Sequence, residues 1–261
     1  MSLDILFIHP NASRKIYQDL NKDHSAIEPP IWAGMLANHC RNKKHNVQVL
    51  DCEVLRLDYK DSVNEIINFN PRIACFVVYG QQPSASSQNM EGAIGISKIL
   101  KKTKPEIKIL FVGGHVAALP TETLEKENSI DIIALNEGVY SISNLLEVEN
   151  LDDYTYLKKI KGIGFRDEEK KIILTNPENI IPKNLLEKDL PGVAWDLLPN
   201  LSSYRTAGWH SWTNNSDKQP FAALYTSLGC PYKCSFCMIN IINRTNNSQN
   251  ISSKNSNIFR W

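Results

Sequence analysis

Short apolar runs alternate with helical patterns over the first 150 residues of the chain. The apolar runs are candidate strands: Ile5 to His9, Val47 to Asp51, Ile73 to Tyr79, Ile107 to Val112 and Ile130 to Leu135. The candidate helices between and after them span residues 31–41, 61–69, 90–102 and 140–148. Strands that alternate with helices form a parallel sheet covered on both faces. We therefore predict a flavodoxin-like (Rossmann-like) α/β domain over residues 1–150.

The loops that follow these strands are the candidate binding segments, because ligands of such sheets bind beyond the carboxyl ends of the strands. The first loop, Pro10 to Pro29, is twenty residues long, and loops of that length are usually functional or disordered. The other loops are YGQQPSASS (79–87), GGHVAALP (113–120) and NEGVY (136–140).

The alternation stops after residue 150. Residues 163–166 and 171–174 flank an acidic turn and predict a hairpin, and an irregular, proline-punctuated stretch follows. Four aromatic residues indicate that this stretch packs against a neighbouring domain, with ordinary core packing as the alternative for each: Trp195, Tyr204, Trp209 and Trp212. We take residues 151–220 as a connector and residues 221–261 as the beginning of another domain.

The composition is that of a soluble protein with a formal net charge of +1, so no basic field favours nucleic acid or an anionic membrane. We expect a small-molecule or protein partner, and the substrate is not identified by the sequence. The N-terminus lacks the features of a secretory signal, and no apolar run is long enough for a membrane span. We therefore expect a cytoplasmic protein.

The six cysteines fall into two groups. Cys40, Cys52 and Cys75 are scattered among apolar residues and are predicted to be small core residues. The others, Cys230, Cys234 and Cys237, lie within eight residues, and clustered thiolates suit zinc or an iron–sulfur cluster. A structural zinc site needs a fourth ligand, for which His210 is the distant candidate. Three thiolates can instead hold three corners of a cubane cluster and leave one iron open.

The spacing Cys230-x3-Cys234-x2-Cys237, with Phe236 before the last cysteine and an expected buried strand over 221–227, resembles the signature of the radical S-adenosylmethionine superfamily. The resemblance implies that the cysteines hold a 4Fe-4S cluster whose open iron chelates S-adenosylmethionine. Reductive cleavage then gives a 5′-deoxyadenosyl radical, with electrons from a donor such as flavodoxin or ferredoxin. Phe236 would border the adenine of S-adenosylmethionine or shield the cluster from water.

Further segments extend this likeness: PPIWAGMLANHC, VGGHVAALP, NEGVYSI and DLPGVAWDLLP resemble the cobalamin-binding radical S-adenosylmethionine proteins. The resemblance implies a corrin at the carboxyl edge of the first domain. The candidate contacts are Gly113, Gly114, His115, Glu137 and Gly138. Their alternative roles are turn formation for the glycines, hydrogen bonding for His115 and helix capping for Glu137. No Asp-x-His-x-x-Gly motif follows the first strand, so we expect cobalamin to bind without a histidine ligand to cobalt.

The family's radical domain is a partial βα barrel, usually of six units, which needs on the order of 180 residues. Only 24 residues follow Cys237. We expect a fragment, one half of a split protein or a degenerate copy, and a chain that is inactive alone. The expected function is that of the N-terminal part of a cobalamin-dependent radical enzyme, a methyltransferase acting on an unactivated carbon, although other members perform cyclisations or rearrangements. The alternative is a non-catalytic cobalamin- or protein-binding module with a vestigial cluster loop.

Overall fold

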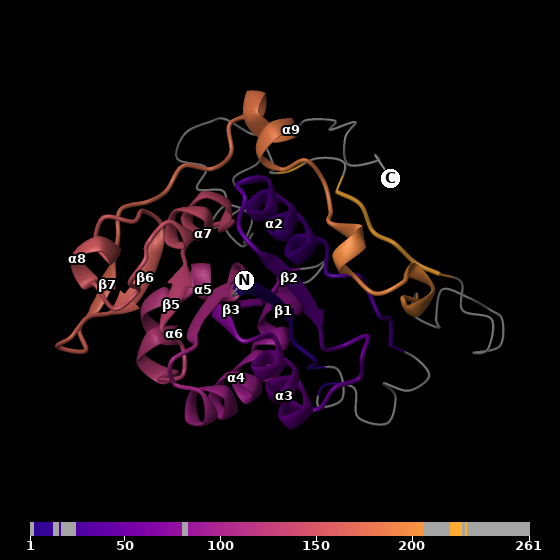
Figure 1. Cartoon of the computed structure of the whole chain (residues 1–261), viewed down its shortest axis with the longest axis horizontal. Coiled ribbons are helices and arrows are strands. Elements are labelled where there is room, and N and C mark those ends of the chain that lie inside the picture. Colours follow the sequence, from indigo (N-terminus) through magenta and orange to yellow (C-terminus); the bar gives the residue numbers. More distant parts are fainter. Residues whose placement is uncertain are drawn as a thin grey trace.

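The computed structural model describes residues 3–12, 16, 25–79, 83–205, 220–225 and 228. Its centre is a seven-stranded sheet in the order β2-β1-β3-β4-β5-β6-β7 (Figure 1). The first five strands are parallel, and the last two add an antiparallel hairpin at one edge. The strands are β1 Leu3–His9, β2 Val47–Asp51, β3 Pro71–Val77, β4 Lys108–Val112, β5 Ile132–Ala134, β6 Ile163–Arg166 and β7 Ile172–Leu174. The predicted flavodoxin-like fold is confirmed, and the predicted hairpin belongs to the same sheet.

The helices agree with the prediction in four places and differ at two predicted loops, 79–87 and 113–120, parts of which are helical. They are α2 Ile31–Asn42, α3 Tyr59–Phe69, α4 Pro83–Thr103, α5 Gly114–Ala118, α6 Pro120–Lys126, α7 Val139–Leu146, α8 Tyr154–Leu157 and α9 Leu186–Asp189. Most of the segment 113–120, predicted as a loop, belongs to the short helices α5 and α6. That prediction was wrong because helices of five and seven residues are too short to show a helical period. Pro120 fits the first turn of α6, where its missing N–H has no partner to lose.

Helices cover both faces of the sheet, with α2 and α7 on one face and α3 and α4 on the other (Figure 1). Successive side chains of β1 alternate between the two layers, so that Ile5 and Phe7 pack with α2 while Leu6 and Ile8 pack with α3 and α4. Burial on both faces explains why these strands are uninterrupted apolar runs in the sequence. The three scattered cysteines lie fully buried in these layers, as predicted: Cys40, Cys52 and Cys75.

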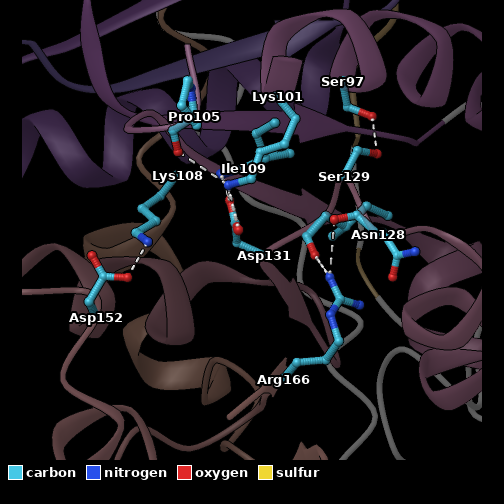
Figure 2. Close-up of polar contacts among 11 residues, drawn as sticks. Ser97, Lys101, Pro105, Lys108, Ile109, Asn128, Ser129, Asp131, Asp152 and Arg166 are labelled. Atoms are coloured by element: carbon cyan, nitrogen blue, oxygen red, sulfur yellow. Dashed lines mark hydrogen bonds and ion pairs between the residues drawn. The ribbon is translucent and has the colours of Figure 1, made fainter. Parts of the chain in front are cut away.

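The amino ends of the strands are closed by polar contacts that fix the hairpin and the neighbouring helices (Figure 2). Arg166, at the end of β6, donates to the carbonyl oxygens of Leu124, at 2.5 Å, and of Ile130. Lys101 of α4 binds the Asp131 carboxylate at 2.7 and 2.8 Å. A hollow of about 230 Å³ opens beside these groups, and several of the charged side chains that line it, Asp131 and Arg166 among them, are already engaged. We assign these contacts a structural role.

The connector runs along α2 (Figure 1). The Ala194 amide donates to the Gly34 carbonyl at 3.1 Å, and the Asn38 side chain donates to the Gly192 carbonyl at 3.0 Å. Of the aromatic residues expected to pack here, Tyr204 is fully buried and Trp195 packs against the core of the first domain, while the other two lie outside the described residues.

The buried strand predicted over residues 221–227 is not formed in its described part. Residues 221–225 are exposed or half-buried and have no strand assignment. A single bridge joins Pro220 to Arg205. A strand persists only beside a partner strand, and among the described residues this segment has no further pairing. None of the helices in the described part of the chain is long and apolar enough to cross a membrane.

Candidate functional site

The carboxyl ends of the five parallel strands share one edge of the sheet, and the predicted cobalamin contacts lie on two neighbouring turns of that edge. Gly113, Gly114 and His115 follow β4, whereas Glu137 and Gly138 follow β5, which pairs with β4. The structure therefore brings all five predicted residues to adjacent loops, although the two groups are separated by more than twenty residues in the sequence.

The turn after β4 packs closely against the residues that follow β3 and the first turn of α4. Gly113 has a φ of +157°, and a Cβ at this residue would lie 2.3 Å from the Val78 carbonyl oxygen. The Gly114 amide donates to the Ser86 hydroxyl at 3.1 Å, and Ser86 donates in turn to that same Val78 carbonyl. Protein packing thus already requires a glycine at residue 113, which is the turn role considered as the alternative to a ligand contact.

His115 is half-buried at the start of α5 and pairs with a residue of α4. Its Nδ1 lies 3.0 Å from the Ser87 hydroxyl, which is exposed. Burial lowers the pKa of His115 below its usual value, an effect that Glu122 opposes and Lys126 reinforces. The sequence did not single out Ser86 or Ser87, because only the fold places the first turn of α4 beside the turn after β4.

Glu137 is buried and holds the connector rather than the helix that follows it. Its Oε1 accepts a hydrogen bond from the Ile181 amide at 2.9 Å. Burial raises the pKa of this carboxyl to about 7, and the bond from Ile181 opposes the shift. Glu137 makes no capping hydrogen bond to the helix that follows, since α7 has Gly138 at its N-cap and no side-chain capping bond.

Three aromatic side chains gather beside these turns. The Trp32 ring, in the first turn of α2, lies 5.3 Å from the Tyr79 ring and 6.3 Å from the Tyr225 ring, measured between centroids. Trp32 Nε1 also donates to the Glu137 carbonyl at 3.0 Å. The Tyr79 hydroxyl is buried and has no hydrogen-bond partner among the described residues. Sequence reasoning missed this cluster, because its first and last members, Trp32 and Tyr225, are 193 residues apart in the sequence.

The predicted cluster residues Cys230, Cys234, Cys237 and Phe236, together with His210, lie outside the described residues. In the part of the chain that the structure describes, no group of three His, Cys, Asp or Glu side chains is placed to hold a metal ion. The cysteine ligand set therefore stays a prediction.

Comparison with known proteins agrees with this architecture. Residues 22–146 match the B12 binding domain family. The chain is 27% identical over 209 residues to the uncharacterized methyltransferase PH0819 of Pyrococcus horikoshii, covering 80% of this chain and 40% of the relative. It is 24% identical over 150 residues to the cobalamin-dependent radical SAM methyltransferase TokK of Streptomyces tokunonensis, covering 57% of this chain and 20% of the relative.

Among solved structures, the cobalamin-dependent S-adenosylmethionine radical enzyme OxsB, with aqua-cobalamin and S-adenosylmethionine bound, shares the fold with a TM-score of 0.60 at 17% identity. That match covers 90% of this chain and 28% of OxsB, so the chain spans well under half the length of the relatives it matches. The domain match and these relatives show that the chain is similar to the cobalamin-binding radical S-adenosylmethionine proteins.

Proposed function

We propose that this chain is the N-terminal part of a cobalamin-dependent radical S-adenosylmethionine methyltransferase that acts on an unactivated carbon. The match of residues 22–146 to the B12 binding domain carries the proposal, because that range includes the turns after β3, β4 and β5. The names of two relatives support methyl transfer as the reaction. When bound, cobalamin would supply the methyl group, and the cluster with S-adenosylmethionine would supply the radical that activates the substrate.

The carboxyl edge fits a corrin held by hydroxyl, imidazole and backbone groups. The Tyr79 hydroxyl is buried without a described partner, and a buried polar group that lacks a partner is unfavourable until one binds. His115 uses Nδ1 for Ser87, which leaves Nε2 for a neutral amide of the corrin. This chain's own residues would thus orient the corrin from its rim.

The binding test uses added bulk at an exposed residue, because a larger side chain at Gly113 would disturb the fold itself. We expect the full chain to retain aqua-cobalamin through gel filtration and Ser87→Trp to weaken this binding at least about tenfold. The matched control is Glu169→Trp, on the exposed turn between β6 and β7. Loss of retention by the wild-type chain, or unchanged binding by Ser87→Trp, would contradict the proposed site.

We propose that Cys230, Cys234 and Cys237 ligate a 4Fe-4S cluster and that Phe236 borders the adenine. Their spacing supports this, as does the contrast with Cys40, Cys52 and Cys75, whose pKa values burial raises well above the usual range, so that they stay protonated. Anaerobic reconstitution with iron and sulfide should give a broad visible absorption band. Cys234→Ala should abolish the band, and the core variant Cys52→Ala should keep it. Tight binding of one zinc without that band would refute the cluster, and retained cobalamin would then favour the non-catalytic module.

A further inference from the structure

A buried polar group joins the ends of β1 and β2. His9 and Asp51 are the last residues of these strands and face each other in the parallel register. His9 Nδ1 lies 3.1 Å from Asp51 Oδ1, and its Nε2 lies 3.9 Å from Glu53 Oε2. Only 7% of His9 and 1% of Asp51 is exposed. An ionisable pair removed from water in this way is favourable only when its hydrogen bonds are satisfied.

The connector supplies a hydrogen-bond donor to the second carboxylate oxygen of Asp51. Tyr204 is fully buried, and its hydroxyl donates to Asp51 Oδ2 at 3.0 Å across 153 residues of sequence. Asp51 Oδ1 additionally accepts from the Glu53 amide at 3.1 Å and from the Val54 amide at 3.2 Å. Both carboxylate oxygens of Asp51 are therefore engaged, and the carboxylate is fixed relative to β1, β2 and the connector.

The backbone around Tyr204 continues toward the cysteine motif. Arg205 and Ile27 exchange two hydrogen bonds of 2.9 Å, which tie the connector to the end of the long first loop. The Phe221 amide donates to the Tyr204 carbonyl at 3.3 Å. Phe221 begins the segment that leads in sequence to Cys230. One residue thus links the edge of the sheet, through its hydroxyl, to the approach of the cluster loop, through its carbonyl.

We propose that Tyr204, Asp51 and His9 form a latch that positions the approach to the cysteine motif on the carboxyl edge of the B12-binding domain. The three are positioning residues, and their role in holding the two cofactors together rests on the proposed function. The hydrogen bonds themselves exist without either cofactor, so the latch is testable in the chain alone.

The stability of the latch depends on the protonation of His9. The groups that face it are Asp51 at the end of β2, Glu53 just after β2 and Glu28 from the first loop, while Tyr204 reaches it through Asp51. Burial disfavours the charged ring, yet the three carboxylates outweigh burial and raise the pKa of His9 from 6.5 to about 8. A raised histidine pKa means that the stabilisation is complete below pH 6.5 and is lost as the pH rises through 8. We expect the latch to loosen over this interval, since a neutral His9 no longer offsets the charge of the buried Asp51 carboxylate and of the half-buried Glu53 and Glu28 carboxylates.

The test is backbone hydrogen exchange in the full chain, read at the amides of Arg205 and Phe221 and corrected for intrinsic rates. Tyr204→Phe keeps the ring and removes the hydroxyl, so these amides should exchange about tenfold faster, the effect of losing a hydrogen bond to a charged group. Amides of β3 and β4 should not change. The control is Tyr156→Phe, whose side chain belongs to an exposed residue of α8.

A second arm compares wild type with His9→Asn between about pH 6 and about pH 9, because asparagine can donate to Asp51 but does not titrate in this interval. Protection at Phe221 should fall with rising pH in wild type and stay flat in His9→Asn. Unchanged exchange in Tyr204→Phe, or an equal rise at all amides, would refute the latch, and so would the same pH dependence in both proteins. Failure to bind cobalamin would refute the proposed function and leave the latch intact.

Discussion

At the scale of single residues, the candidate site depends on partners that no local pattern reveals. The sequence identified Glu137 and His115, but their partners Ile181 and Ser87 lie 44 and 28 residues away. Likewise, nothing near Asp51 in the sequence indicates Tyr204. Turn and helix signals act over a few residues, whereas these contacts arise only when the sheet brings distant segments together.

Glu137 gives a prediction about pH. Its carboxyl has a pKa raised to about 7 from 4.5, so the associated stability is complete below pH 4.5 and is lost as the pH rises through 7. Glu137→Gln keeps an oxygen for the Ile181 amide and removes the buried charge. We expect the variant to be more stable than wild type by about 1–3 kcal/mol at about pH 8 and similar at about pH 4.5. Urea unfolding at both pH values measures this. The exposed Glu149→Gln serves as the control, and an equal change at both pH values would contradict the buried charge.

At the scale of elements, the five strands were predictable because strands buried on both faces are continuous apolar runs. The positions of α2, α3 and α7 were also predictable, since each has apolar residues at helical spacing. Helices α5 and α6 were missed because five and seven residues are too few to show that period. The strand expected over 221–227 needed a partner strand, and strand pairing is a tertiary property.

The contact between α2 and the connector predicts an unusual effect of a helical alanine. Alanine usually stabilises a helix interior by about 1 kcal/mol relative to glycine. At Gly34, however, a Cβ would lie 2.5 Å from Val193 Cγ1. We expect Gly34→Ala to destabilise the protein by about 1–3 kcal/mol and to be neutral or stabilising in a Val193→Ala background. A double-mutant cycle by urea unfolding tests this, and an equal cost in both backgrounds would show that the connector does not pack here in solution.

At the scale of the whole molecule, the connector contributes to the same core as the first domain. Ile163, Phe165, Ile181, Leu186 and Leu190 of residues 151–198 are buried together with the side chains of α2 and α7. The hairpin also covers β5, which pairs with β6 in antiparallel register. A chain ending at the predicted boundary, residue 150, would therefore expose both an apolar face and a strand edge, and such edges favour aggregation.

A chain ending at residue 205 would keep the hairpin, the Glu137 contact and the Tyr204 hydroxyl on Asp51. We expect it to unfold in one cooperative urea transition and to elute as a monodisperse species. The chain ending at residue 150 should be less stable by several kcal/mol, because burial of each large aliphatic side chain contributes about 1.5–3 kcal/mol. Sedimentation velocity and urea unfolding of the two chains provide the comparison. If the shorter chain is monomeric and unfolds at the same urea concentration as the longer one, the connector is a separate unit and its packing on α2 adds no stability. If only the shorter chain loses stability, the folded domain ends after residue 198.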